Sequence, residues 1–458
     1  MKKLHYFLAA AVLVGCQNET TKPKDYLVFS GTVTNPNSEK GFVGGHQLSE
    51  EFQIKEDGTF TDTLHIEEPG YYTFKIGQET STFYLKNGED INLSIDTNQF
   101  DESITYTGEG AEENNYLAQK YITDEKITSN MKDFYSLEEK EFVGKLDSLK
   151  TKLENDLELS KASEDFKELE KKNLMYERYV HLLNYPQYHG YFSGNMSYSP
   201  SDDFNANIIE VDLDNEFDAK KYNSYSTIVL NDFRKEIGPL YMTMPDSVPT
   251  KAVALIKEKK SPAVQAILMS AMAREISPED AEKSKFYYDE FMKISKDEDF
   301  KEELTKAYDL VEKLAPGAPS PTFTYENHDG GTTSLADLKG KYVYVDVWAT
   351  WCGPCKREIP FLKKVEEEYH NKNIEFVSIS IDTQADHDKW KKFVDDEELG
   401  GTQLFADKDW KSEFVQSYGI NAIPRFLLID TEGNIVSASA PRPSNPKLKE
   451  TFDGLEKI

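Results

Sequence analysis

The pair Cys352 and Cys355 restricts the fold of this 458-residue chain more than any other feature. It follows a near-continuous apolar run at 342–348, which predicts a buried strand, and it opens a segment at 353–369 with helical spacing of apolar residues. The third cysteine of the chain, Cys16, lies at the end of an N-terminal leader. Two cysteines so close together cannot join distant parts of a fold, so the spacing alone indicates a redox pair or half of a metal site.

The segment around this pair alternates strands with helices. A stiff linker at 315–321, Ala-Pro-Gly-Ala-Pro-Ser-Pro, marks its beginning, and all four tryptophans lie beyond it. Further strands are expected at 374–381, 403–405, 425–430 and 434–438. Strand–helix–strand units followed by a hairpin predict a mixed sheet with helices on both faces, an α/β domain over residues 316–458.

The first two thirds of the chain predict two further regions, which makes the protein multidomain. Residues 26–110 contain short alternating segments separated by turn signals such as Asp57-Gly58 and Pro69-Gly70, and we expect an N-terminal antiparallel β-sandwich there. Residues 111–315 are rich in Lys, Glu and Leu with apolar residues three and four apart, which predicts a central α-helical region.

Charge and hydropathy exclude two classes of partner for the bulk of the chain. The formal net charge of -29 repels phosphate backbones, so we expect no nucleic acid partner. No apolar run after the N-terminus approaches the roughly 18 residues that read as a membrane-spanning helix.

The N-terminus has the pattern of a leader. Lys2 and Lys3 precede the apolar stretch 4–14, and Leu13-Val14-Gly15-Cys16 resembles the lipobox of bacterial lipoproteins. The resemblance implies a lipoprotein signal peptide over 1–16, lipidation of Cys16 and a tether over 17–25. We therefore expect a lipid-anchored protein of the cell envelope that faces the periplasm, and Asn18, where many inner-membrane lipoproteins have Asp, slightly favours the outer membrane.

The position of the pair favours thiol chemistry. A cysteine at the start of a helix is stabilised as the thiolate, the form that attacks disulfides, and Pro354 suits the first turn because its missing N–H is not needed there. The expected sequence is attack by Cys352 on a substrate disulfide, followed by attack of Cys355 that releases the product.

The run 345–360, Val-Asp-Val-Trp-Ala-Thr-Trp-Cys-Gly-Pro-Cys-Lys-Arg-Glu-Ile-Pro, resembles thioredoxins, and closely the TlpA/ResA-type thiol-disulfide oxidoreductases. The resemblance covers about 316–458 and implies a thioredoxin fold. It also implies that Asp346 is the buried acid beneath the second cysteine, where it serves proton transfer, and that Glu358 tunes the thiols. The residues that it identifies as catalytic are Cys352, Cys355, Asp346 and Glu358.

A second run, 418–427, resembles the thioredoxin segment in which a cis-proline faces the active site. The resemblance implies that the Ile423 backbone pairs with an extended substrate. The substrate-binding residues are then Trp351, Gly353, Pro354, Ile423 and Pro424. The region from Asp57-Gly58 to 106–108 also looks like the N-terminal β domain that precedes thioredoxin domains in some bacterial lipoproteins.

Other functions fit the residues less well. A zinc site needs four ligands, and neither His328, His370 nor His387 has companion spacing; a c-type haem would need His after Cys355, where Lys356 stands. We predict no metal and no cofactor. A peroxidase-like antioxidant is one alternative, although Ala349 replaces the Thr usual in peroxiredoxins, and a client-binding lipoprotein with a subsidiary thioredoxin domain is the other.

The predicted function is that of an envelope thiol-disulfide oxidoreductase that reduces protein disulfides. Gly353-Pro354 resembles the reducing thioredoxins, whose potentials lie near about -270 mV. A reductant in an oxidising compartment needs a membrane thiol donor. The expected substrates are disulfide-bearing envelope proteins, with apocytochromes c as one candidate.

Overall fold

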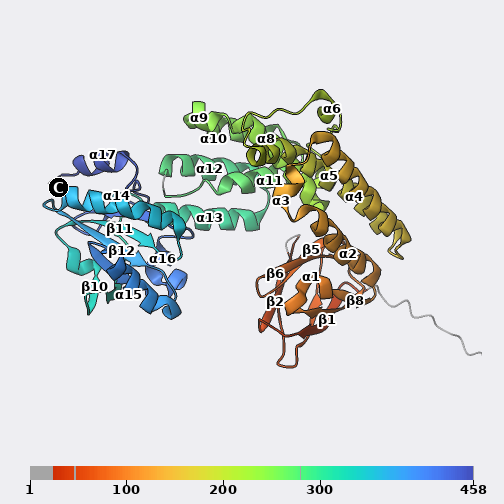
Figure 1. Cartoon of the computed structure of the whole chain (residues 1–458), viewed down its shortest axis with the longest axis horizontal. Helices are drawn as coiled ribbons and strands as arrows, with labels where there is room; N and C mark the ends of the chain where they lie inside the picture. Colours follow the sequence, from red (N-terminus) through yellow and green to blue (C-terminus); the bar gives the residue numbers. More distant parts are fainter. Residues whose placement is uncertain (1–23, 46–47, 279, 457) are drawn as a thin grey trace, which may run out of the picture. The chain divides into compact units, whose positions relative to one another are not determined.

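The computed structural model describes residues 24–45, 48–278, 280–456 and 458. The described residues form two compact units, the first ending at Asn231 and the second beginning at Asp232, and Figure 1 colours them from red to blue along the sequence. The predicted signal peptide, Cys16 and most of the tether lie outside the described residues. No helix within the described ranges is long and apolar enough to cross a bilayer.

The first unit begins with a β-rich region, as predicted. Its strands form two four-stranded sheets, in the orders β4-β1-β7-β8 and β3-β2-β5-β6. The strands are β1 Leu27–Thr34, β2 Lys40–Gly45, β3 Leu48–Gln53, β4 Thr59–Leu64, β5 Gly70–Ile76, β6 Glu79–Leu85, β7 Asp90–Asp96 and β8 Thr105–Gly108.

One strand pair differs from the antiparallel prediction, because β1 and β7 are parallel. The chain reaches β7 from β6, which belongs to the other sheet, so β7 enters through a crossover rather than a hairpin. Side chains from both sheets meet in one hydrophobic cluster, where Phe29 of β1 contacts Phe52 of β3 with ring centroids 5.5 Å apart. The alternation of buried and exposed residues along β1 and β7 produces this shared core.

Helices make up the rest of the first unit. Tyr71 and Tyr84, on β5 and β6, pack against a cluster that includes Phe166 of α5 and Tyr116 of α2, so the helices cover the outer face of that sheet. The helices are α1 Phe100–Ser103, α2 Ala111–Thr128, α3 Met131–Tyr135, α4 Glu139–Leu159, α5 Glu164–Ser193, α6 Asp202–Asn205, α7 Glu216–Lys221 and α8 Asn223–Ile237, the last of which continues into the second unit.

The second unit begins with helices and ends with a seven-stranded sheet. Leu310, on the last of these helices, packs against the core of the sheet region. The helices before the sheet are α9 Leu240–Thr243, α10 Val248–Glu258, α11 Pro262–Ala273, α12 Ala281–Ile294 and α13 Glu298–Lys313.

The sheet is mixed, as predicted, in the order β10-β9-β13-β12-β11-β14-β15. The three central strands β13, β12 and β11 are parallel, and the outer pairs are antiparallel. The strands are β9 Thr324–Asn327, β10 Thr332–Ser334, β11 Tyr342–Trp348, β12 Ile374–Ser380, β13 Thr402–Phe405, β14 Arg425–Ile429 and β15 Ile435–Ser437, and the helices are α14 Gly353–Tyr369, α15 His387–Asp396, α16 Glu413–Ser417 and α17 Lys447–Asp453.

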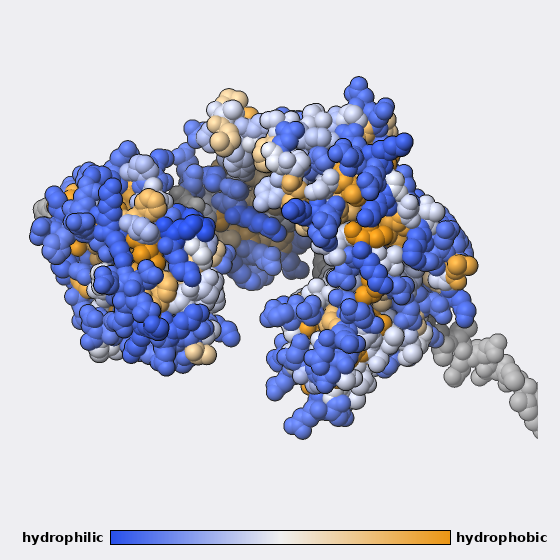
Figure 2. All heavy atoms as spheres, in the orientation of Figure 1, coloured by the Kyte–Doolittle hydropathy of each residue, from blue (hydrophilic) through white to orange (hydrophobic). Residues whose placement is uncertain are grey.

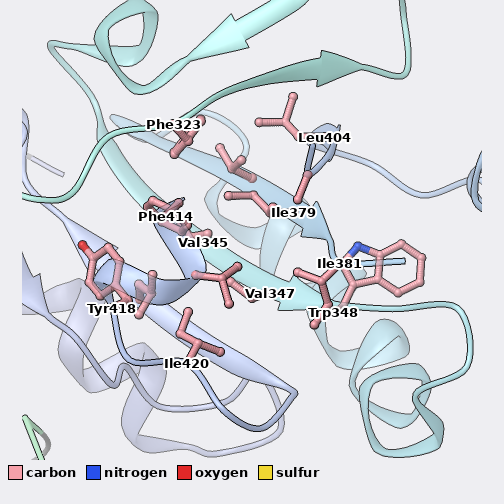
Figure 3. Packing of buried hydrophobic residues seen from close by; sticks show 14 of the residues in the cluster. Phe323, Val345, Val347, Trp348, Ile379, Ile381, Leu404, Phe414, Tyr418 and Ile420 are labelled. Carbon is pink, nitrogen blue, oxygen red and sulfur yellow. The ribbon is translucent and has the colours of Figure 1, made fainter. Parts of the chain in front are cut away.

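Strand β11 is buried along its whole length, because both faces of the sheet are covered. Val345 and Val347 point into one hydrophobic cluster, shown in Figure 3, together with Phe323, Ile379 and other buried residues. Tyr342 and Tyr344 belong to a second cluster, which includes residues of α14 and α17. Outside these cores, the face of the molecule in Figure 2 is mostly hydrophilic, in keeping with the net charge of -29.

Candidate active site

Cys352 lies at the junction of the central strand and its helix. Strand β11 ends at Trp348, and Cys352 is the N-cap residue of α14, with extended backbone angles (φ -79°, ψ 99°). Its N–H donates to Ala349 O at 3.0 Å, which closes the turn between strand and helix. The first residue of the pair is thus held at the positive end of the helix dipole.

The two cysteines are joined by a disulfide bond, with Cα atoms 5.3 Å apart. The backbone N–H of Cys355 donates to Cys352 Sγ at 3.1 Å. Both cysteines are only 3% exposed, whereas the side chain of the preceding Trp351 is 50% exposed and lies near Trp410, with ring centroids 6.3 Å apart. The cysteine pair is therefore buried, and the adjacent Trp351 is exposed to solvent.

Asp346 is a carboxyl group in the middle of the buried strand β11, and its Oδ1 has no hydrogen-bond partner among the described residues. Burial, together with the nearby negative charges of Glu358 and Glu366, raises the pKa of Asp346 to about 8. The acid predicted to serve proton transfer is therefore placed in an environment that keeps its proton near neutral pH.

Glu358 lies three residues after Cys355 on α14 and is buried. Its carboxylate accepts two hydrogen bonds from Ser444, from the backbone N–H at 3.0 Å and from Oγ at 2.9 Å. The predicted tuning residue is thus fixed by the loop before α17, and its charge acts on Asp346.

The Ile423–Pro424 peptide bond is cis, as the motif predicted. Arg425, the next residue, pairs with Val347 across β14 and β11, so Pro424 lies beside the end of β11 that leads to the cysteines. Ile423 packs against the hydrophobic cluster that contains Cys352 and Cys355. The structure thus brings Ile423 and Pro424 to the same end of the sheet as the cysteine pair.

Sequence reasoning missed a residue that holds the turn before the pair. Thr350 donates its N–H and its hydroxyl to the carboxylate of Asp382, which follows β12 and is fully buried. It also missed Glu366 on α14, whose pKa is raised by burial to about 7. The available signal for Asp382 was an acidic residue directly after the predicted strand 374–381. Glu366 is one of three consecutive glutamates, and nothing in the sequence distinguishes it.

Within the described parts of the chain, no group of three or more His, Cys, Asp or Glu side chains is placed to hold a metal ion. His328 instead lies near Asp329 and Asp395, and His387 contacts Glu326. The geometry around Cys352 and Cys355 is that of a dithiol–disulfide couple, in which one bond between two sulfurs is made or broken.

Known proteins resemble the last third of the chain. Residues 315–455 match the protein family described as Redoxin. Thiol-disulfide oxidoreductase ResA of Bacillus thuringiensis (strain Al Hakam) is 31% identical over 148 residues, which are 32% of this chain and 80% of that protein. ResA of Bacillus subtilis (strain 168) is 28% identical over 127 residues, 27% of this chain and 67% of that protein.

Among solved structures, the thioredoxin domain of a thiol-disulfide oxidoreductase from Bacteroides vulgatus is 32% identical. It covers 31% of this chain and 96% of that one, with a TM-score of 0.28. A mixed sheet of this kind around a cysteine pair at a helix start, together with the Redoxin match and the ResA relatives, defines a thioredoxin-like thiol-disulfide oxidoreductase.

Within that class, the chain belongs to the ResA-type family, because it is more than 30% identical to a ResA protein over most of that protein's length. The family predicted from the motif around Cys352 and Cys355 is therefore confirmed.

Proposed function

We propose that this protein reduces disulfide bonds of other proteins in the cell envelope and that Cys352 and Cys355 carry the reaction. The observation that supports this most directly is the place of Cys352 at the N-terminus of α14, where the N–H of Cys355 points at its sulfur. A helix N-terminus and a donated hydrogen bond both stabilise a thiolate, the nucleophile of disulfide exchange. Trp351, Gly353, Pro354, Ile423 and Pro424 are the proposed contact surface for the substrate chain.

The reaction transfers two electrons from the dithiol to the substrate. The Cys352 thiolate attacks one sulfur of the substrate disulfide, which releases one substrate thiolate and leaves a mixed disulfide. Cys355 then loses its proton and attacks Cys352 Sγ, which releases the second substrate thiolate and forms the Cys352–Cys355 disulfide. A thiol donor must reduce this disulfide before the next turnover, and we assign that role to a membrane thiol carrier.

The proposed setting combines the leader with the motif. Lipidation of Cys16 would hold the protein at the membrane surface, facing the periplasm, with the outer membrane slightly favoured. Disulfide-bearing envelope proteins are the proposed substrates, with apocytochromes c among the candidates. Incorporation of a labelled fatty acid into the full chain but not into Cys16→Ala tests the anchor, and labelling of both or of neither contradicts it.

The reductase function is tested with the full chain and insulin as the substrate. The wild type should reduce insulin when dithiothreitol regenerates it, Cys352→Ser should be inactive, and Cys355→Ser should accumulate a mixed disulfide. The reduction potential should lie near about -270 mV, and a value above about -180 mV would assign the protein to the oxidases or isomerases instead. Peroxide consumption as fast as disulfide reduction would favour the antioxidant alternative.

A second candidate function, client binding, is supported by a cavity in the first unit. It has a volume of about 520 Å³, within the usual range for ligand sites. Its walls come from the outer face of β5 and β6 and from α2, α5 and α8, and they include Thr73, Thr82, Lys120, Asp124 and Glu177. We propose that the two sheets form a sandwich that presents this cavity to a client. Insulin reduction that persists in Thr82→Trp while a physiological client is lost would separate the two functions.

A further inference from the structure

A row of polar side chains crosses the centre of the otherwise apolar sheet in the second unit. Asp346 on β11 is in register with Ser378 on β12, and Ser378 is in register with Gln403 on β13. All three residues are at most 7% exposed. Neighbouring residues in register on parallel strands point to the same face, and a small cavity that all three line confirms it here. Polar groups so deep in a sheet need partners.

Three polar atoms around this cavity have no partner within the described residues. They are Asp346 Oδ1, Trp348 Nε1 and Gln403 Oε1. The Gln403 amide nitrogen is already engaged, because it donates to Gly400 O at 2.7 Å. The set consists of a donor, the indole N–H, an acceptor, the Gln403 amide oxygen, and a carboxyl group that donates when it is protonated. A water molecule that accepts from Trp348 and from protonated Asp346 and donates to Gln403 would satisfy all three groups and keep its second hydrogen free to donate.

The size of the cavity also fits a single water molecule. Its volume is about 10 Å³, which is close to the least that holds one water. Ile359 and Leu362 of α14 form its apolar wall. A water held there by three protein groups would be part of the structure rather than bulk solvent.

Glu366 forms the other polar end of the cavity. Its side chain is half-buried, and its carboxylate lies against the Gly400–Gly401 turn, where a Cβ at position 400 would be 2.6 Å from Oε2. The absence of a side chain at Gly400 therefore makes room for the Glu366 carboxylate. Lys363 is the one cation among the described residues that line the cavity. Its ammonium group donates a hydrogen bond to Glu397 O.

The face of α14 that covers the sheet connects this cavity to the cysteine pair. Cys355, Glu358, Leu362 and Glu366 follow one another at three- and four-residue spacing, which places them on one side of the helix. Asp346 faces this side, since it lines the cavity together with Leu362 and Glu366, and the charges of Glu358 and Glu366 act on it. The charged groups that surround Asp346 are therefore Glu358, Lys363 and Glu366 from α14, while the lining residues from β12, β13 and the 399–400 turn are uncharged.

We propose that Glu366 is the exit of a proton route that runs from Cys355 to Asp346 and through one water in this cavity to solvent. The inference rests on the proposed function, in which Cys355 loses a proton as it attacks Cys352. The Asp346 carboxyl group, which holds a proton near neutral pH, gives that proton to the water as it takes up the proton of Cys355. The water in turn passes a proton to the Glu366 carboxylate, and Glu366 releases it to solvent. No electrons move along the route, and reduction of the disulfide uses it in reverse.

The acidities of the two carboxyl groups suit such a transfer. The pKa of Asp346 is raised to about 8 and that of Glu366 to about 7, so a proton moves between them at small cost. Both groups also exchange protons near neutral pH, where a reductase of this class works.

Single-turnover kinetics with an aromatic disulfide, 5,5′-dithiobis(2-nitrobenzoate), separate the two chemical steps. Attack by the thiolate of Cys352 in the reduced full chain releases the first coloured thiolate, and resolution by Cys355 releases the second. The signal of the double variant Cys352→Ser/Cys355→Ser is subtracted to remove any contribution of Cys16. We expect Glu366→Gln to leave the first phase unchanged and to slow the second about 10-fold near neutral pH. This is less than the roughly 100-fold effect of a group that takes the proton directly, because Glu366 acts through the water and Asp346.

Three further variants sharpen the test. Glu366→Asp, which keeps an acid, should restore part of the second rate, and Gln403→Met, which removes an acceptor for the water, should slow the same phase. Glu367→Gln changes the same charge at the exposed neighbouring residue and should match the wild type. Equal second phases in Glu366→Gln and Glu367→Gln from about pH 6 to about pH 9 would refute the route, as would equal slowing of both phases.

A failure of the proposed function has a different signature. If the wild type released neither coloured thiolate above the double variant, the cysteines would not act as a dithiol at all. If the wild type released both at normal rates and Glu366→Gln did the same, the reductase function would stand and only the proton route would be wrong.

Discussion

The carboxylate of Asp382 accepts two hydrogen bonds from Thr350, one from the backbone N–H at 2.9 Å and one from Oγ1 at 2.7 Å. Thr350 stands two residues before Cys352, and Asp382 follows the neighbouring parallel strand. The carboxylate also accepts from Ser380 Oγ at 2.7 Å, and Asp382 is fully buried. Hydrogen bonds to Asp382 therefore fix the turn before Cys352, and Asp382 lies outside both of the sequence motifs that identify the family.

Asp382→Ala should lower the free energy of unfolding of the second unit by about 2–4 kcal/mol, because it leaves buried donors of Thr350 and Ser380 without an acceptor. Urea unfolding followed by tryptophan fluorescence measures this, since all four tryptophans lie beyond residue 315. Thr350→Ser is the matched control, because it keeps both donors and should cost about 1 kcal/mol or less. An equal loss in the two variants would show that the carboxylate does not hold the turn.

Asp346→Asn should change the pH dependence of stability. The folded chain keeps a proton on Asp346 from its ordinary pKa of 3.8 up to about 8, whereas the unfolded chain has released it. The free energy of unfolding therefore falls as pH rises through this window, by about 1.4 kcal/mol per pH unit for this group.

The variant lacks this titration, so its stability relative to the wild type should increase from about pH 5 to about pH 9. Urea unfolding at the two pH values, again with tryptophan fluorescence, gives the comparison. Glu367→Gln serves as the control for a lost acidic side chain at the surface. A constant difference between Asp346→Asn and the wild type at both pH values would mean that Asp346 titrates normally.

Lys120→Met should destabilise the first unit. Lys120 Nζ lies 2.6 Å from Glu170 Oε1 and 2.7 Å from Glu177 Oε1, and the side chain of Glu170 is fully buried. Removal of the cation leaves two carboxylates facing each other, which should cost about 3–5 kcal/mol. Circular dichroism during urea unfolding of the full chain measures the loss. Lys126→Met, at an exposed position of the same helix, should change stability by less than about 0.5 kcal/mol.

Gly419→Ala should destabilise the contact between α13 and the sheet region. Gly419 has a positive φ of 59°, and a Cβ there would lie 2.4 Å from Leu310 Cδ2. The backbone conformation alone costs about 1–2 kcal/mol, and the overlap should add about 1–3 kcal/mol. Gly331→Ala is the control, because its φ of 71° is similar but no atom lies within 4 Å of its Cβ. Equal losses of tryptophan-monitored stability would show that Leu310 moves aside freely.

The motifs around the cysteines were predictable because they are local. A strand that ends at Trp348 and a helix that begins at Gly353 place Cys352 at a helix N-terminus whatever the rest of the chain does. The parallel pairing of β1 with β7 was not predictable, because it depends on which sheet a strand joins after β6. Alternation of buried and exposed residues is the same for both orientations.

The family, the mixed sheet and the cysteine pair could be predicted from residues that are neighbours along the chain. The surroundings of the pair could not, because they are built by residues that only folding brings together. Asp382, Ser444 and Gln403 come from separate segments, and the register of β11, β12 and β13 brings Gln403 into the row that begins at Asp346. Which groups surround a buried charge depends on distances in the folded chain, and the sequence alone does not give these distances.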